Sequence, residues 1–173
     1  AEKNSYSVLR REHRQGFKAG AINNWMQMNG QQYDYMVLLD ADSYIPPDWV
    51  EEALKYAEHP ANSKVSIFQG LINIWNLDNK FVRTLAPLHV FGQDIWERRL
   101  ANHLDAVFCY GHNALIRMSH VREVGGFVES YVSEDFATAV KLASDKGYKS
   151  RFIPLHTYEA LPENIRGFIK RQN

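Results

Sequence analysis

Residues 35–42 read YMVLLDAD, so that a run of five apolar residues changes abruptly to two carboxylates separated by one alanine. An apolar run of this length is typical of a β-strand that is covered on both faces, as in a parallel sheet. The change in polarity falls at the C-terminal end of this strand. In open α/β sheets the loops that leave this edge converge on a crevice, and ligands bind there. We therefore expect Asp40 and Asp42 to lie at a binding edge.

Strand and helix patterns alternate outward from this stretch. Before it, residues 18–28 have the spacing of an amphipathic helix, and a short strand is predicted around residues 6–9. After it, the pattern predicts helices at 46–59, 88–104, 119–125 and 133–147, with strands at 65–69, 113–118 and 149–154. This alternation predicts a layered α/β fold with a mostly parallel sheet.

The segment before Tyr35 contains no strongly apolar strand of the kind that normally opens a nucleotide-binding α/β domain. We therefore expect a sheet that lacks its N-terminal strand or strands. The chain is predicted to begin partway through its domain.

The composition is that of a soluble globular domain, with 173 residues, 45% hydrophobic residues, a formal net charge of zero and one cysteine. A chain of this length buries about 70% of its extended surface, so it needs no disulfide or structural metal for stability. Zero net charge gives no long-range field that attracts nucleic acid, which argues against nucleic-acid binding by the protein as a whole. We expect one domain over residues 1–173.

The pair Asp40 and Asp42 offers hard oxygen ligands in one turn. Mg²⁺ and Mn²⁺ suit such a pair, because these ions keep few protein ligands and take the others from water and phosphate oxygens. The alternative is a turn whose carboxylates are simply solvated, since Asp is a common turn residue.

A second acidic pair, Glu134 and Asp135, follows Ser133 at the start of a predicted helix. Asp135 is a candidate general base that takes a proton from an attacking hydroxyl. The alternative is a capping role, because acidic residues in a first helical turn complement the helix dipole. We expect the buried face of this helix to consist of Phe136, Val140 and Ala143.

Residues 109–113 read CYGHN and form a polar turn between two apolar segments. Gly111 allows the backbone to approach a ligand closely, and His112 and Asn113 have side chains that hydrogen-bond to sugars or phosphates. A structural turn with a satisfied histidine is the alternative. A nucleophilic cysteine needs neighbours that stabilise its thiolate, and the sequence near Cys109 offers none besides His112. Cys109 is therefore predicted to be a core residue and not a nucleophile.

Residues 14–20 read RQGFKAG and open a predicted helix with two cations and two glycines. Free backbone N–H groups with Lys18 and Arg14 would make a local phosphate cradle, although the segment taken alone favours a solvated loop. Trp75 and Trp96 are further candidates, for stacking on a sugar, and the rest of the sequence gives them no support.

Taken in order, these motifs resemble the family 2 inverting glycosyltransferases of the GT-A fold. The resemblance is to the processive, membrane-embedded branch that contains cellulose synthase and the osmoregulated periplasmic glucan glucosyltransferases. It covers nearly the whole chain and rests on KAGAIN at 18–23, DAD at 40–42, GHNALIR at 111–117, GGF at 125–127 and SED at 133–135.

The resemblance implies transfer of a sugar from a nucleotide donor, with UDP as the nucleotide, to a carbohydrate acceptor. Asp40 and Asp42 would hold Mg²⁺ or Mn²⁺ against the diphosphate, and Asp135 would deprotonate the acceptor hydroxyl for a single inverting displacement. The residues implied to bind the substrates are Lys18, Asp40, His112, Asn113 and Glu134.

The resemblance also implies that this soluble chain is an internal fragment of a larger enzyme, with flanking transmembrane helices and a site on the cytoplasmic face of a membrane. The family's first strand would precede Ala1, and its Gln-x-x-Arg-Trp element is incomplete at residues 168–173.

Two other functions stay open. One is a catalytically silent module that binds nucleotide sugar or carbohydrate, and the other is a metal-dependent phosphotransferase with Asp40 as the nucleophile.

Overall fold

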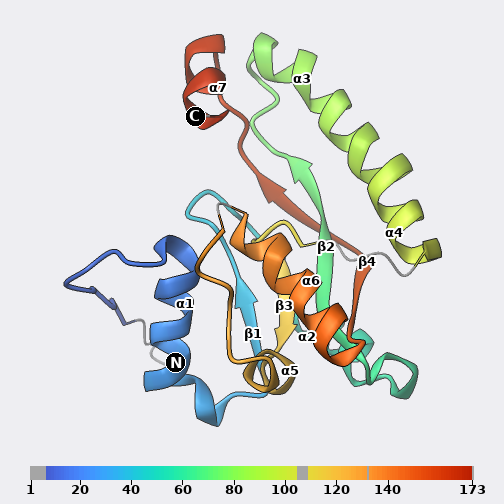
Figure 1. Cartoon of the computed structure of the whole chain (residues 1–173). Helices are drawn as coiled ribbons and strands as arrows, with labels where there is room; N and C mark the ends of the chain where they lie inside the picture. The colour runs from blue at the N-terminus through green and yellow to red at the C-terminus, as the bar shows by residue number, and fades with distance from the viewer. Residues whose placement is uncertain (1–6, 105–108, 132, 173) are drawn as a thin grey trace, which may run out of the picture.

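The computed structural model describes residues 7–104, 109–131 and 133–172, whose course is shown in Figure 1. Within these ranges no helix is both long and apolar enough to cross a membrane. Residues 7–9 have no regular secondary structure, so the strand predicted there is wrong, and Tyr6 lies outside the described residues.

The described part of the chain forms a four-stranded sheet with the order β1-β3-β2-β4 (Figure 1). Strands β1 (Tyr35–Leu38), β2 (Val65–Ile74) and β4 (Lys149–Glu159) run in one direction. Strand β3 (Ala114–Arg117) pairs antiparallel with both β1 and β2. The sheet is therefore mostly parallel in strand direction, as predicted, but the sequence pattern did not indicate the reversed β3.

Strand β1 lies at an edge of this sheet and pairs with β3 on its other side. Of its residues, Met36 is buried and the others are partly buried, so the expectation of complete cover on both faces is not met. A groove of about 510 Å³ runs along β1 and α1, lined mainly by apolar side chains such as Ile22, Trp25 and Val37. None of the predicted site residues lines it.

Helices cover both faces of the sheet. Adjacent residues of a strand point to opposite faces, and apolar side chains on each face pack against helices. Ile67 and Ile116 face a core built with α1 (Phe17–Met28), α5 (Met118–Glu123) and α6 (Glu134–Lys146). Their neighbours Phe68 and Leu115 face α2 (Trp49–Glu58), whose Trp49 is 2% exposed. The result is the layered α/β arrangement that the alternating pattern predicts.

Helix α6 presents a different face to the sheet from the predicted one. Its buried residues are Thr138, Ala139 and Leu142, whereas Phe136 is 47% exposed and Val140 is 43% exposed. The small side chain of Ala139 permits close packing against the sheet, and one step along a helix turns a side chain by about 100°. The expected stripe therefore lies beside the contact face.

The helix predicted at 88–104 begins earlier, at Lys80. Its parts are α3 (Lys80–Phe91), the π-helical segment η3 (Gly92–Glu97) and α4 (Arg98–Leu104). The Asn79 side-chain oxygen accepts hydrogen bonds from the Phe81 and Val82 N–H groups at 2.8 and 3.2 Å and caps the start. Pro87, which directly precedes the predicted start, lies inside α3, although proline is unusual in a helix interior.

Strand β4 continues past Pro154, where the sequence pattern ended it. Pro154 is exposed, and the pairing register between β2 and β4 shifts beside it, between Gln69 and Leu71. Proline is tolerated at such an irregularity because it needs no ladder partner for its nitrogen. The remaining elements are the 3₁₀ helices η1 (Gly30–Gln32) and η2 (Pro60–Asn62) and the C-terminal helix α7 (Ile165–Gln172).

Candidate functional site

The turn that follows β1 presents Asp40 and Asp42 at the predicted edge of the sheet. The Ser43 N–H donates to the Asp40 carbonyl at 3.0 Å, and the Asp40 N–H donates to the Ser43 hydroxyl oxygen at 3.2 Å. Lys18 on α1 forms an ion pair with the Asp40 carboxylate. Asp42 is exposed. The turn therefore offers one paired and one open carboxylate.

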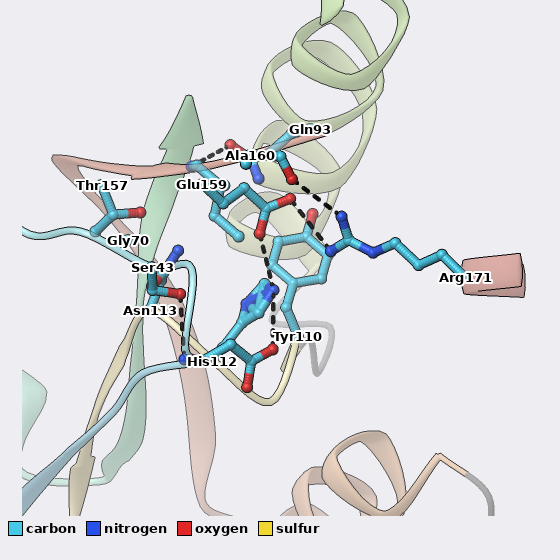
Figure 2. A network of polar contacts seen from close by, with 12 residues as sticks. Ser43, Gly70, Gln93, Tyr110, His112, Asn113, Thr157, Glu159, Ala160 and Arg171 are labelled. Carbon is cyan, nitrogen blue, oxygen red and sulfur yellow. Dashed lines mark hydrogen bonds and ion pairs between the residues drawn. The ribbon is translucent and has the colours of Figure 1, made fainter. Parts of the chain in front are cut away.

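His112 lies between two acidic residues that are far apart in the sequence, namely Glu159 (Figure 2) and Asp40. Its Nε2 is 3.1 Å from Glu159 Oε2 and 3.9 Å from Asp40 Oδ2. The side chain is 12% exposed, and this burial lowers the pKa of His112 even though the charge of Asp40 acts in the opposite direction. At neutral pH the ring is therefore uncharged and holds one donor and one acceptor nitrogen.

Glu159 and Arg171 belong to this network, and neither was predicted. Glu159 ends β4, is 2% exposed, and has a pKa that burial raises. Arg171 on α7 places Nη2 at 3.7 Å from Glu159 Oε1 and donates from Nη1 to the Ala160 carbonyl at 3.2 Å. The indication available in the sequence was a glutamate at the end of an alternating strand, which was overlooked because the strand was ended at Pro154.

Gln69, a fully buried residue of β2, hydrogen-bonds to the backbone of the turn that carries His112. Gln69 Nε2 donates to the carbonyl oxygens of His112 and Asn113 at 2.9 and 3.2 Å, and its Oε1 accepts from the Tyr110 N–H at 3.1 Å.

Burial raises the pKa of the Cys109 thiol to about 12, in agreement with its predicted place in the core.

Asn113 differs from the other predicted site residues in its burial. Its backbone has φ of 53°, its exposed fraction is 0%, and its side-chain nitrogen and oxygen have no hydrogen-bond partner within the described residues. The amide of Asn113 is therefore buried without a partner in this conformation, and its role in substrate binding stays a prediction.

Asp135 lies against Gly111, in the turn that carries His112. Its Oδ1 accepts from the Ser133 hydroxyl at 3.1 Å and from the Phe136 N–H at 2.7 Å, so it satisfies a free N–H group of the first helical turn, while the N-cap residue Ser133 makes no side-chain cap bond. Its Oδ2 faces Gly111, where an added Cβ would be 2.5 Å away. Asp135 therefore bonds to the first turn of α6 while its other carboxylate oxygen lies beside Gly111.

Glu134 points to another groove, of about 470 Å³, which it lines with Gly16, Phe17, Glu129 and neighbouring residues. Asp40, Asp42 and His112 do not line this groove. The structure thus brings Lys18, Asp40 and His112 together, places Asp135 against the adjacent Gly111, and leaves Glu134 to one side.

The donor atoms in the Asp40–Asp42 turn fit a hard divalent cation. Both residues supply carboxylate oxygens, the ligands that Mg²⁺ and Mn²⁺ prefer. Within the described residues, no group of three or more His, Cys, Asp or Glu side chains is placed to hold a metal ion. Two carboxylates alone fit an ion that takes its other ligands from water and phosphate, and they do not fit a structural zinc.

A family model described as "Glycosyl transferase family group 2" matches residues 35–173. The chain belongs to this family. It is similar to glucomannan 4-beta-mannosyltransferase 1 of Oryza sativa subsp. japonica, at 26% identity over 94% of this chain and 31% of that protein. It is also similar to glucans biosynthesis glucosyltransferase H of Escherichia coli (strain K12), at 28% identity over 94% of this chain and 20% of that protein. The chain thus spans less than a third of the length of these family relatives.

Among solved structures, the chain resembles the mannosyltransferase PcManGT from Pyrobaculum calidifontis, determined in complex with GDP-Man and Mn²⁺. The TM-score is 0.55 at 22% identity, over 90% of this chain and 38% of that one. The predicted family resemblance and the predicted GT-A fold are confirmed.

Proposed function

We propose that this chain is part of an enzyme that transfers a sugar from a nucleotide-sugar donor to a carbohydrate acceptor in glucan or polysaccharide synthesis. One observation carries the proposal: Lys18, Asp40 and His112 converge, and Asp135 packs against the glycine that precedes His112. Membership of glycosyltransferase family 2 and the names of the relatives support the same chemistry.

Asp40 and Asp42 are the residues proposed to hold Mg²⁺ or Mn²⁺, which when bound neutralises charge on the leaving diphosphate. Lys18 adjoins Asp40 and adds a positive charge for the phosphates. The motif resemblance favours UDP, whereas the related solved structure holds GDP-Man, so both nucleotides belong in a binding test.

Asp135 is proposed to accept the proton of the acceptor hydroxyl, whose oxygen bonds to the anomeric carbon as the bond from that carbon to the diphosphate breaks on the opposite face; this single displacement inverts the configuration. His112 is proposed to hydrogen-bond to the donor sugar or the acceptor through its uncharged ring, with Glu159 fixing the ring's orientation. Asn113 and Glu134 stay predictions as substrate-binding residues. The membrane location and the flanking transmembrane helices are also predictions.

Replacement of the proposed base tests the catalytic assignment. In the protein that carries this chain, Asp135→Asn is expected to lower the rate of sugar transfer by roughly 10²- to 10⁴-fold, because the acceptor hydroxyl loses its base. The assay measures labelled sugar transferred from UDP-glucose or GDP-mannose to a β-linked oligosaccharide. Asp145→Asn, at the exposed end of the same helix, serves as the matched control. Equal losses in the two variants would contradict a specific role for Asp135.

A further inference from the structure

A groove of about 540 Å³ opens beside Asp42, between the turn after β1 and the C-terminal ends of β2 and β4. It is lined by Ala41, Asp42, Ser43, Tyr44, Trp75 and Tyr158. Trp75 is 59% exposed and Tyr44 is 56% exposed. Large apolar side chains gathered around a groove are uncommon on a protein surface, and where they occur they mark binding sites.

The backbone fixes these three aromatic residues relative to one another. Tyr44 and Tyr158 form an isolated antiparallel bridge, in which each N–H donates to the other's carbonyl at 2.8 Å. Their ring centroids are 6.0 Å apart, with 47° between the ring planes. The Trp75 N–H donates to the Glu159 carbonyl at 3.1 Å. Three segments, namely the Asp42 turn and the ends of β2 and β4, thus hold one preorganised aromatic surface.

We propose that this aromatic groove binds a pyranose ring of the acceptor glycan. A pyranose has one face of C–H groups, which packs on the electron-rich face of an aromatic ring, and a rim of hydroxyls that hydrogen-bond to neighbouring polar groups. Ser43 and Asp42 supply polar groups at one wall. The inference rests on the proposed sugar transfer and adds to it a subsite for the acceptor.

The shape of the groove favours a sugar over a flat nucleobase. A base gains most from parallel stacking, whereas Tyr44 and Tyr158 are tilted and Trp75 is open to solvent. Of the proposed site residues, Asp42 lines the groove, while His112 and Asp135 do not. A ring bound there lies next to the reaction centre and not in it. The groove therefore recognises a sugar unit of a longer acceptor, one or more units away from the reacting hydroxyl.

Saturation-transfer NMR on the protein that carries this chain tests the inference, with β-linked glucohexaose and mannohexaose as probes. We expect saturation of the C–H protons of a hexasaccharide, and a Kd that rises about tenfold in Trp75→Ala or Tyr44→Ala because one stacking contact is removed. Trp75→Phe keeps an aromatic face and is expected to retain most of the binding. Phe91→Ala removes an aromatic side chain that is 55% exposed on α3, outside the groove, and is the matched control.

Hexasaccharide binding that is absent, or that is equal in Trp75→Ala, Tyr44→Ala and the parent chain, would overturn the inference. So would displacement of the hexasaccharide by uridine, since the groove would then be a nucleobase site. Metal-dependent nucleotide binding is measured in the same variants. Its persistence in Trp75→Ala separates failure of this inference from failure of the proposed function.

Discussion

Gly111 is the residue at which the backbone and the proposed catalytic base meet. Its φ is 76°, a conformation that residues with a side chain rarely adopt. An added Cβ would be 2.5 Å from Asp135 Oδ2 and 3.0 Å from the Asp135 Cβ. The sequence suggested that Gly111 makes room for a ligand. In the structure, the group that occupies this room is the carboxylate of Asp135.

Gly111→Ala is expected to displace the Asp135 carboxylate as well as strain the backbone. Gly147→Ala is the matched control, because Gly147 has φ of 66° but nothing within 4 Å of an added Cβ. Both variants are expected to lose about 1 kcal/mol of unfolding free energy from backbone strain, measured by urea denaturation. Only Gly111→Ala should also lose sugar transfer, so similar activities in the two variants would contradict the account.

Individual site residues differed in how far the sequence could predict them. Asp40 and Asp42 stand at an abrupt change from apolar to polar residues, and such a change marks the end of a strand, whereas His112 was indicated by a polar turn between two apolar segments. For Glu159 the local signal is its place at the end of an alternating strand, which does not by itself indicate a site. Its burial and its contact with His112 come from tertiary packing, which no short window of sequence contains.

Among the elements, α6 and β4 show where pattern analysis loses accuracy. Hydrophobicity assigned Phe136 to the buried face of α6, but the close approach of the helix to the sheet favours the small residue Ala139. Pro154 was taken as the end of β4, yet a register shift in the ladder accommodates it. In both cases packing between elements decided the result, whereas the existence and order of most elements followed from local periodicity.

The attachment of α5 to β2 is expected to depend on pH. His120 on α5 has Nδ1 at 2.8 Å from the Ser66 hydroxyl oxygen. Its ring stacks on the ring of Tyr148, with 3.7 Å between the ring centroids. Burial lowers the pKa of His120, and the charge of Arg117 lowers it further, while Glu123 acts in the opposite direction.

The pKa of His120 is lower in the folded state than in the unfolded state, so the folded state binds a proton at His120 more weakly. Protonation of His120 therefore favours unfolding. Its contribution to stability is complete above the unfolded pKa of about 6.5 and is lost as the pH falls through the lower folded pKa. Urea denaturation between pH 7 and pH 5 is therefore expected to show a shrinking stability advantage of the parent chain over His120→Gln. An advantage that does not change with pH would contradict the prediction.

For the whole molecule, the order β1-β3-β2-β4 assembles the site from distant parts of the chain. Lys18 comes from α1, Asp40 from the turn after β1, His112 from the turn before β3, and Glu159 from the end of β4. Arg171 reaches the same place from α7 (Figure 2). Sequence patterns located the ends of strands but not the strand order or pairing register, because these depend on non-local contacts. The α/β class was therefore predictable, and the His112 network was not.

The most direct test of the central claim is calorimetric titration of UDP and GDP into the protein that carries this chain, with and without Mn²⁺. The account predicts nucleotide binding that requires Mn²⁺, is lost in Asp42→Ala, and is unchanged in the exposed control Asp78→Ala. Binding that persists without Mn²⁺ or in Asp42→Ala would contradict the assignment of the Asp40–Asp42 turn, and binding of neither nucleotide would contradict the proposed donor site.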